Sequence, residues 1–246
     1  MSRPLLPGLL TIPRSPVLDF LAPRLVQYRH AATTAAPTPS TVQVSPESNA
    51  SKKPTRPLTD AQRAFLDSAL RVNQAGELAA TLIYTAQTPP LVNAHPSLRP
   101  LLAHMHAQEA GHFHTFNGLL AKHRIRPTAM YPVWQVAATA LGWGTAMMGR
   151  EAAMACTEAV ETEIGEHYNG QVRVLLEMVR DMEAKGEVVG DELMGLLETV
   201  RKTRDEELEH LDHAVDNDAK KAEGHEILTN VIRGGCRAAI WVSERI

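Results

Sequence analysis

Residues 108–113 read QEAGHF and residues 204–210 read RDEELEH, so the chain contains the spacing Glu-x-x-His twice. The two pairs are Glu109 with His112 and Glu207 with His210. In a helix, residues three apart project from the same face, about one turn apart along the axis. Each pair can therefore direct a carboxylate and an imidazole into one space.

Two further carboxylates interrupt apolar stripes in the helical segments that precede these pairs. Glu77 interrupts the stripe within residues 66–84, and Glu161 interrupts the stripe within residues 154–168. Positions at three- and four-residue spacing share one helix face, and an apolar face is the one expected to be buried. The chain thus repeats the order of a single Glu followed by Glu-x-x-His.

The four intruding carboxylates predict a metal centre. A buried carboxylate without a partner costs on the order of several kcal/mol, so four of them need a shared positive charge. Four carboxylates and two imidazoles form the ligand set of di-iron and di-manganese carboxylate bundles, and oxygen-rich ligation favours these metals over zinc or copper. The sequence therefore predicts an all-α, ferritin-like four-helix bundle with an additional C-terminal helix.

Neighbouring acids and histidines leave alternatives open within each helix. Glu158 and Glu163 lie near Glu161, and a rotation of the fourth helix would exchange Glu207 and His210 for other residues. The remaining alternatives are Glu206, Glu209, His213, His106 and His114. We expect the residues closest to the apolar stripes to be the ligands and the others to be solvated or to support the ligands.

Capping and breaking residues predict the helix boundaries. Thr59 and Gln62 have the spacing of a capping box, prolines from Pro89 onward favour an end to the first helix, and Asp191 is expected to cap the fourth. The glycines expected to break the third helix are Gly142, Gly144 and Gly149. The predicted helices are 60–87, 98–123, 132–185, 192–217 and a last one that runs from after Gly224 to about 243. No segment alternates with period two, so no strands are predicted.

The N-terminal segments differ in composition from the rest of the chain. Residues 1–30 carry arginines among apolar residues with a single acid, which is typical of a mitochondrial transit peptide. Residues 31–57 are rich in Ala, Thr, Ser and Pro and are expected to form a disordered linker. The remaining residues, 58–246, are expected to form one domain, and its excess of 26 acidic over 18 basic residues disfavours nucleic-acid binding.

The most apolar segment is VWQVAATALGWGTAMMG, residues 133–149. It is short for a membrane span and rich in Ala and Gly, whose transfer energies are weak. Two interpretations remain open: a buried helix, or a helix that lies on a membrane surface or lines a quinone channel.

Five stretches of the chain resemble one enzyme family. They are RVNQAGE (71–77), QEAGHF (108–113), AMACTEAVETEIGEHYNGQ (153–171), RDEELEH (204–210) and GCRAAIWVSERI (235–246). Over about residues 61–246 the chain resembles the demethoxyubiquinone hydroxylase family of ubiquinone biosynthesis. Gln74 and Leu78 depart from the family pattern, in which His and Tyr are common at these positions.

The resemblance implies a di-iron monooxygenase. Such an enzyme uses O2 to hydroxylate the benzoquinol ring of a polyprenylated demethoxyubiquinol, late in ubiquinone (coenzyme Q) synthesis, with electrons that come ultimately from NADH. By the resemblance, the ligands of the two iron ions are Glu77, Glu109, His112, Glu161, Glu207 and His210. Glu109 and Glu207 would bridge both ions.

The resemblance also implies a cellular setting. A substrate with a long isoprenoid tail requires membrane contact, so we expect a peripheral protein on the matrix side of the mitochondrial inner membrane. Residues 133–149, the last helix and the three tryptophans are the candidates for this contact. A lipid-binding partner protein, a ubiquinone biosynthetic complex and self-association are the expected interactions.

Two residues beyond the ligand set are candidates for a catalytic role. Tyr168 lies two turns beyond Glu161 on the same helix face, and His167 is adjacent. Our hypothesis is that they relay electrons or protons between the quinone and the irons. The alternative is that Tyr168 is a core tyrosine with a hydrogen-bonded hydroxyl.

Two other classes of function are compatible with the same ligands. One is a ferroxidase or peroxidase of the ferritin or rubrerythrin type, although Cys156 and Cys236 are too few for the four-cysteine iron site of rubrerythrins. The other is a lipid-binding scaffold subunit that keeps the metal only for stability. The complete set of ligands argues against the scaffold.

Overall fold

The computed structural model describes residues 58–246, which contain six α-helices and no strand. The helices are α1 (Asp60–Ala94), α2 (Arg99–His123), α3 (Tyr131–Met148), α4 (Arg150–Ala184), α5 (Asp191–Asp216) and α6 (His225–Ser243). The predicted all-α class is confirmed. The transit peptide expected at 1–30 and the linker expected at 31–57 lie outside the described residues.

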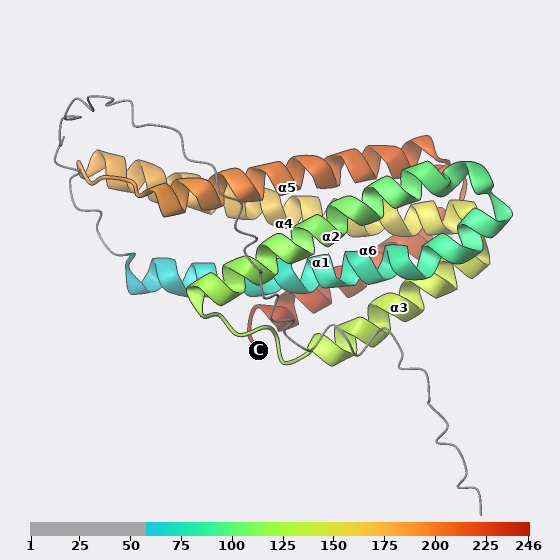
Figure 1. The fold of residues 1–246 in the computed structure, drawn as a ribbon, viewed down its shortest axis with the longest axis horizontal. Coiled ribbons are helices and arrows are strands. Elements are labelled where there is room, and N and C mark those ends of the chain that lie inside the picture. Colours follow the sequence, from blue (N-terminus) through green and yellow to red (C-terminus); the bar gives the residue numbers. More distant parts are fainter. Residues whose placement is uncertain (1–57) are drawn as a thin grey trace, which may run out of the picture. The chain divides into compact units, whose positions relative to one another are not determined.

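Two antiparallel helix pairs form the bundle, α1 with α2 and α4 with α5 (Figure 1). Helix α3 packs along α1, and α6 packs along α4 and also touches α1. The prediction of a ferritin-like bundle with an additional C-terminal helix is therefore confirmed. Helices α3 and α6 lie outside the four-helix core and flank α1 and α4.

The bundle core contains two apolar clusters, with polar residues between them along the helices. One cluster contains Leu70 of α1 and Phe116 of α2, and the other contains Tyr84 of α1 and Met105 of α2. Glu77 lies between the two clusters on α1, and it is only 1% exposed. The apolar clusters therefore exclude water from both ends of the polar section.

Helix α1 begins where the sequence predicts but continues past its expected end. Thr59 Oγ1 accepts a hydrogen bond from the Gln62 amide, and the Gln62 side chain accepts one from the Thr59 amide, which confirms the capping box. The expected break at the prolines is wrong, because the helix runs through Pro89 and Pro90 to Ala94.

Packing explains how α1 tolerates the two prolines. A proline removes the hydrogen bond to the carbonyl four residues earlier, and Thr85, four residues before Pro89, is exposed. Leu91 and Val92, which follow the prolines, are 2% and 5% exposed in the core. Burial of these two side chains, at about 1.5–3 kcal/mol each, offsets the lost hydrogen bonds.

The third predicted helix is divided at Gly149, one of the three glycines expected to break it. Gly149 has φ +117°, a value that favours glycine, and it separates α3 from α4. Gly142 instead lies inside α3, where a Cβ atom would be 2.5 Å from the carbonyl oxygen of Ile83. This close approach explains how α3 packs against α1.

The cap expected at the start of α5 is wrong. Asp191 is the first residue of the helix, Gly190 occupies the capping position, and no side chain caps the helix there. Asp191 and Glu192 instead place negative charge in the first turn, where it interacts favourably with the helix dipole.

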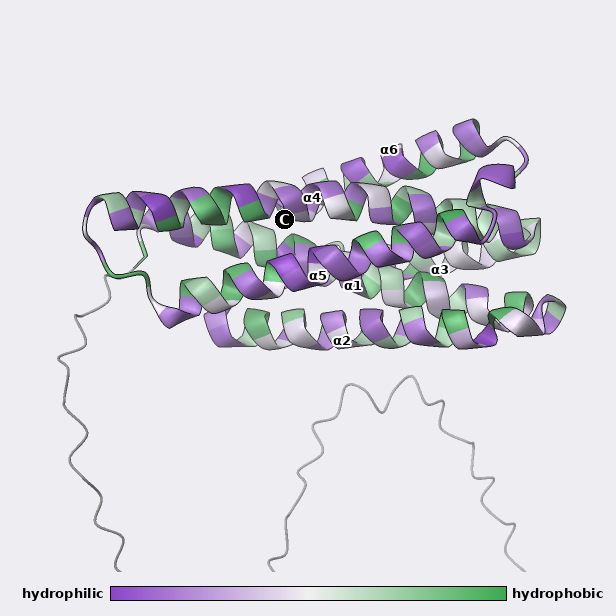
Figure 2. Ribbon diagram, turned by 90° about the horizontal axis from the view of Figure 1, so that it is seen from above, coloured by the Kyte–Doolittle hydropathy of each residue, from purple (hydrophilic) through white to green (hydrophobic). Residues whose placement is uncertain are grey.

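Helix α3 is buried on one face only, so the interpretation of residues 133–149 as a buried helix holds only in part, and the interpretation as a helix at a membrane surface or quinone channel stays a prediction. Ala138, Gly142 and Ala146 are buried, whereas the other face of the helix is exposed. The large exposed apolar residues of this helix are Val133, Val136, Trp143, Met147 and Met148, and those of α6 are Ile227, Val231 and Trp241. Figure 2 shows these helices coloured by hydropathy. Within the described residues, no helix combines the length and apolarity that a membrane crossing requires.

Candidate metal centre

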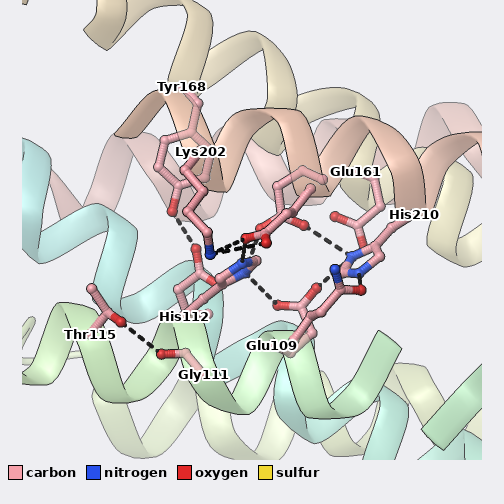
Figure 3. Close-up of polar contacts among 12 residues, drawn as sticks. Glu109, Gly111, His112, Thr115, Glu161, Tyr168, Lys202 and His210 are labelled. Carbon is pink, nitrogen blue, oxygen red and sulfur yellow. Dashed lines mark hydrogen bonds and ion pairs between the residues drawn. The ribbon is translucent and has the colours of Figure 1, made fainter. Parts of the chain in front are cut away.

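The six predicted ligands come together in the middle of the bundle. Helix α1 supplies Glu77, α4 supplies Glu161, and α2 and α5 each supply one Glu-x-x-His pair. All six side chains are buried, with exposed fractions between 0% and 6%. Figure 3 shows Glu109 and His112 of α2, Glu161 of α4 and His210 of α5 pointing toward one another.

These residues form two overlapping groups of four. One group is Glu77, Glu109, His112 and Glu207, and the other is Glu109, Glu161, Glu207 and His210. In each group, one nitrogen or carboxylate oxygen per residue lies within 4.8 Å of the others. Glu109 and Glu207 belong to both groups, which is the arrangement that two bridging carboxylates require.

Both imidazoles direct the same ring nitrogen toward the carboxylates. His112 Nδ1 lies 3.3 Å from Glu77 Oε2 and 3.2 Å from Glu207 Oε1. His210 Nδ1 lies 2.9 Å from Glu109 Oε1 and 3.2 Å from Glu207 Oε2. The Nδ1 atoms are therefore the nitrogens that face the space between the carboxylates.

Burial and mutual repulsion disfavour ionisation of all four carboxyl groups of the cluster at once. Burial, followed by repulsion from Glu207, raises the pKa of Glu77, Glu109 and Glu161. Burial would also raise the pKa of Glu207, but its interactions with His112 and His210 outweigh burial and lower this pKa to about 2. Although burial lowers the pKa of His112, Glu207 and Glu77 raise it to about 11. Without a cation, ionisation of Glu77, Glu109 and Glu161 is therefore disfavoured.

The donor atoms of the cluster fit a pair of metal ions. Six buried atoms that could bind a metal ion have no hydrogen-bond partner among the described residues: Glu77 Oε2, both oxygens of Glu109, His112 Nδ1, Glu161 Oε2 and Glu207 Oε1. Buried polar atoms are rarely left unpaired, and these converge on one space. Two divalent cations would satisfy them and would compensate four ionised carboxylates.

The alternative residues lie elsewhere. Glu158 pairs with Lys220 and His225, and Glu163 pairs with Arg233. The alternatives of α5 and α2 lie at the edge of the bundle. Glu209 and His213 group with His104 at the surface. His106 Nε2 lies 3.0 Å from Thr85 Oγ1, and His114 is exposed. None of these six alternative residues belongs to either buried group of four.

Three residues support the ligands: the sequence analysis missed Tyr84 and Gln108 in this role, whereas Glu206 is one of the residues that it expected to be solvated or to support the ligands. The Tyr84 hydroxyl donates to Glu161 Oε1 at 3.1 Å, Gln108 Oε1 lies 3.0 Å from His210 Nε2, and Glu206 Oε2 lies 2.7 Å from His112 Nε2. Spacing could have identified Tyr84, because it follows Glu77 by the same seven residues that separate Tyr168 from Glu161.

His167 and Tyr168 lie beside the cluster. The Tyr168 hydroxyl donates a hydrogen bond to Glu77, and His167 Nε2 lies 2.7 Å from the side-chain nitrogen of Gln171. Burial lowers the pKa of His167, so its ring is neutral at neutral pH. Of the two departures from the family pattern, Gln74 donates to Asn117 at 3.1 Å and does not hydrogen-bond to Glu77.

An apolar cavity of about 380 Å³ lies next to the cluster and is lined by α1, α3, α4 and α6. Its lining includes the buried residues Glu77 and Tyr168, together with His167. Val231 of α6 also lines it and is 69% exposed. The cavity therefore extends from the carboxylate cluster to the apolar surface of α3 and α6.

The fold and the cluster define a class of protein: a ferritin-like helical bundle with a buried Glu and His set of the kind that binds two metal ions. Comparison with known proteins identifies the family. The family model described as Ubiquinone biosynthesis protein COQ7 matches residues 64–243. The chain belongs to this family.

Named relatives span fungi, animals and bacteria. The chain is 48% identical over 192 residues to 5-demethoxyubiquinone hydroxylase, mitochondrial, of Saccharomyces cerevisiae, covering 77% of this chain and 82% of the relative. It is 43% identical to the human NADPH-dependent 3-demethoxyubiquinone 3-hydroxylase, mitochondrial, with the same coverage of each chain. It is 42% identical to 3-demethoxyubiquinol 3-hydroxylase of Rhodospirillum rubrum, covering 74% and 79%. The predicted resemblance is confirmed.

Proposed function

We propose that this chain hydroxylates the benzoquinol ring of a polyprenylated demethoxyubiquinol in ubiquinone biosynthesis, with O2 as co-substrate and two iron ions as the cofactor. The chain is an enzyme of the hydroxylating monooxygenase class, as its relatives are. One observation carries the finer proposal. Glu77 belongs both to the buried carboxylate cluster and to the lining of the apolar cavity, and Tyr168, which donates a hydrogen bond to Glu77, lines the same cavity.

Six residues would hold the metal ions. Glu77 and His112 would bind one ion, Glu161 and His210 the other, and Glu109 and Glu207 both. This oxygen-rich set suits iron or manganese, and reaction with O2 favours iron. When bound, the iron ions would supply the electrons and the coordination positions needed to activate O2.

The cavity would position the substrate. Its volume of about 380 Å³ lies within the range of small-molecule sites, roughly 300–1,000 Å³, and its apolar walls exclude water from the ring. The ring would lie near Glu77 and Tyr168, and the isoprenoid tail would leave past Val231. The exposed apolar side chains of α3 and α6 would contact the membrane surface that supplies the substrate.

His167 and Tyr168 would act between the ring and the carboxylates. Tyr168 donates its hydroxyl proton to Glu77 in a hydrogen bond and so fixes the orientation of that carboxylate. The neutral His167 ring lines the same cavity and could accept a proton from a quinol hydroxyl. Both residues therefore remain candidates for an electron or proton relay.

The proposed setting is the matrix side of the mitochondrial inner membrane, with peripheral attachment. The yeast and human relatives are named as mitochondrial, and residues 1–30 have the composition of a transit peptide. We also propose that the chain interacts with a lipid-binding partner protein and with a ubiquinone biosynthetic complex. For the electron source, the sequence-based expectation is NADH, whereas the name of the human relative specifies NADPH.

A single-turnover experiment tests the proposed reaction. The full-length chain would be loaded anaerobically with ferrous iron, mixed with a short-chain demethoxyubiquinol, and exposed to oxygen-18 gas. We expect mass spectrometry to detect a ring hydroxyl that carries the label. Iron oxidation without a hydroxylated ring would overturn the proposal in favour of a ferroxidase or peroxidase.

A further inference from the structure

The two halves of the carboxylate cluster are related by a reciprocal pattern of contacts. Tyr84 follows Glu77 by seven residues on α1, and Tyr168 follows Glu161 by seven residues on α4. Each tyrosine donates its hydroxyl to the carboxylate of the other helix: Tyr84 to Glu161, and Tyr168 to Glu77. The two carboxylates that are not shared between the groups of four therefore have equivalent partners.

The two histidines have reciprocal contacts as well. The residue immediately before each Glu-x-x-His pair reaches the histidine of the other pair across the seam between α2 and α5. Gln108 precedes the first pair and contacts His210, whereas Glu206 precedes the second pair and contacts His112. In both histidines, Nδ1 faces the shared carboxylates and Nε2 faces this outer partner.

The outer partner is where the two halves differ chemically. His112 Nε2 meets a carboxylate oxygen of Glu206 at 2.7 Å, whereas His210 Nε2 meets the amide oxygen of Gln108 at 3.0 Å. Lys202 Nζ lies 3.0 Å from Glu206 Oε1 and 3.1 Å from Glu206 Oε2, the oxygen that contacts His112, but the Lys202 side chain is 71% exposed and therefore largely hydrated. Because hydration screens an exposed ion pair, the Lys202 charge offsets only part of the Glu206 charge that acts on the His112 ring.

We propose that Glu206 makes the two metal positions unequal, so that the first metal ion binds at the His112 position and the second at the His210 position. The inference rests on the metal ligands of the proposed function. A carboxylate that accepts the outer N–H of a ligating histidine makes the ring a stronger ligand, and loss of such a partner typically lowers metal affinity 10- to 100-fold. A neutral amide acceptor has a weaker effect, because hydrogen bonds to charged acceptors are about twice as strong.

Cobalt(II) titration of the full-length, metal-free chain tests the order of binding. We expect two binding steps whose dissociation constants differ by about tenfold or more. Crystals grown with one equivalent of cobalt should show anomalous scattering mainly at the position of Glu77 and His112. Equal scattering at both positions would overturn the proposal.

Exchange of the two outer partners provides the matched controls. Glu206→Gln should reduce the ratio of the two dissociation constants by weakening the first step, although repulsion between the ions remains. Gln108→Glu should also reduce this ratio, but by tightening the second step. The double exchange should restore the ratio with the preferred position reversed, and circular dichroism would verify the fold of each variant.

The outcome is independent of the hydroxylation experiment. Cobalt binding needs neither quinol nor O2, so the preferred position can be measured even if no hydroxylated ring forms. An unchanged ratio in Glu206→Gln, or an unchanged preferred position in the double exchange, would show that Glu206 does not set the order of binding.

Discussion

The carboxylate cluster and the apolar cavity meet at Glu77 and its partner Tyr168, yet they are built in opposite ways. The cluster gathers ionisable groups from four helices in a space closed by apolar residues at both ends. The cavity lies where α3 and α6 flank the bundle, has mostly apolar walls, and reaches the surface. In the proposed function, the four-helix bundle would hold the metal ions, and α3 and α6 would receive the isoprenoid substrate.

The largest expected effect on metal binding and activity comes from a substitution in the carboxylate cluster. Glu207 belongs to both groups of four, so Glu207→Ala should abolish binding of both ions and all ring hydroxylation. Metal content measured by mass spectrometry and the single-turnover assay would check this. Glu198→Ala changes an exposed residue of the same helix and should retain both properties. If Glu207→Ala sustained ubiquinone synthesis in cells, a scaffold role would be favoured over catalysis.

The next largest effect is expected from a substitution in the cavity, which should lower activity without changing metal binding by the cluster. Ala239 of α6 lines the cavity, whereas the neighbouring Ala238 is exposed and does not. Ala239→Phe should lower kcat/KM for the quinol by roughly 10- to 100-fold and leave metal content unchanged, because the ring fills space that the substrate needs. Ala238→Phe is the control. Equal rates in the two variants would mean that the quinol does not use this cavity.

A smaller effect is expected on the packing that forms the cavity wall. A Cβ atom on Gly142 would lie 2.5 Å from the Ile83 carbonyl oxygen, whereas a Cβ atom on Gly144 would meet nothing within 4 Å. Gly142→Ala should destabilise the protein by about 1–3 kcal/mol. Gly144→Ala should stabilise it by up to about 1 kcal/mol. Thermal unfolding would measure both, and equal Tm values would show that α3 can shift along α1 without loss.

The smallest effect concerns the two tyrosines. Tyr84→Phe and Tyr168→Phe each remove one hydrogen bond to a carboxylate, worth about 0.5–1.5 kcal/mol, so both should weaken metal binding slightly and to a similar extent. Only Tyr168 lines the cavity. With both metal positions filled, a slower turnover in Tyr168→Phe alone would support the relay, and equal turnover in the two variants would contradict it.

Particular residues show which features of the site sequence periodicity can predict and which it cannot. Glu77 and Glu161 interrupt apolar stripes, and the structure buries both beside the two Glu-x-x-His pairs. Periodicity favoured Glu207 over Glu206, because Glu207 continues the apolar stripe of α5, but it could not predict what Glu206 contacts. The structure turns Glu207 into the cluster and places Glu206 against His112 from the side.

The helix boundaries show the same limit. Gly149 breaks the chain as expected because its positive φ is a local property. The prolines at 89 and 90 fail to end α1 because burial of Leu91 and Val92 outweighs a local preference. Local signals therefore predict boundaries well only where packing does not oppose them.

The sequence by itself determined the helical class, the family and the six residues that share inward faces, because helix periodicity and motif spacing are written in consecutive residues. Only the tertiary structure decided which outer partner each histidine receives, that Tyr84 reaches Glu161, and that a cavity joins Glu77 to the surface of α3 and α6. These features depend on the offset and rotation of one helix against another. Side-chain packing across the whole bundle sets both, and no short segment of the chain encodes it.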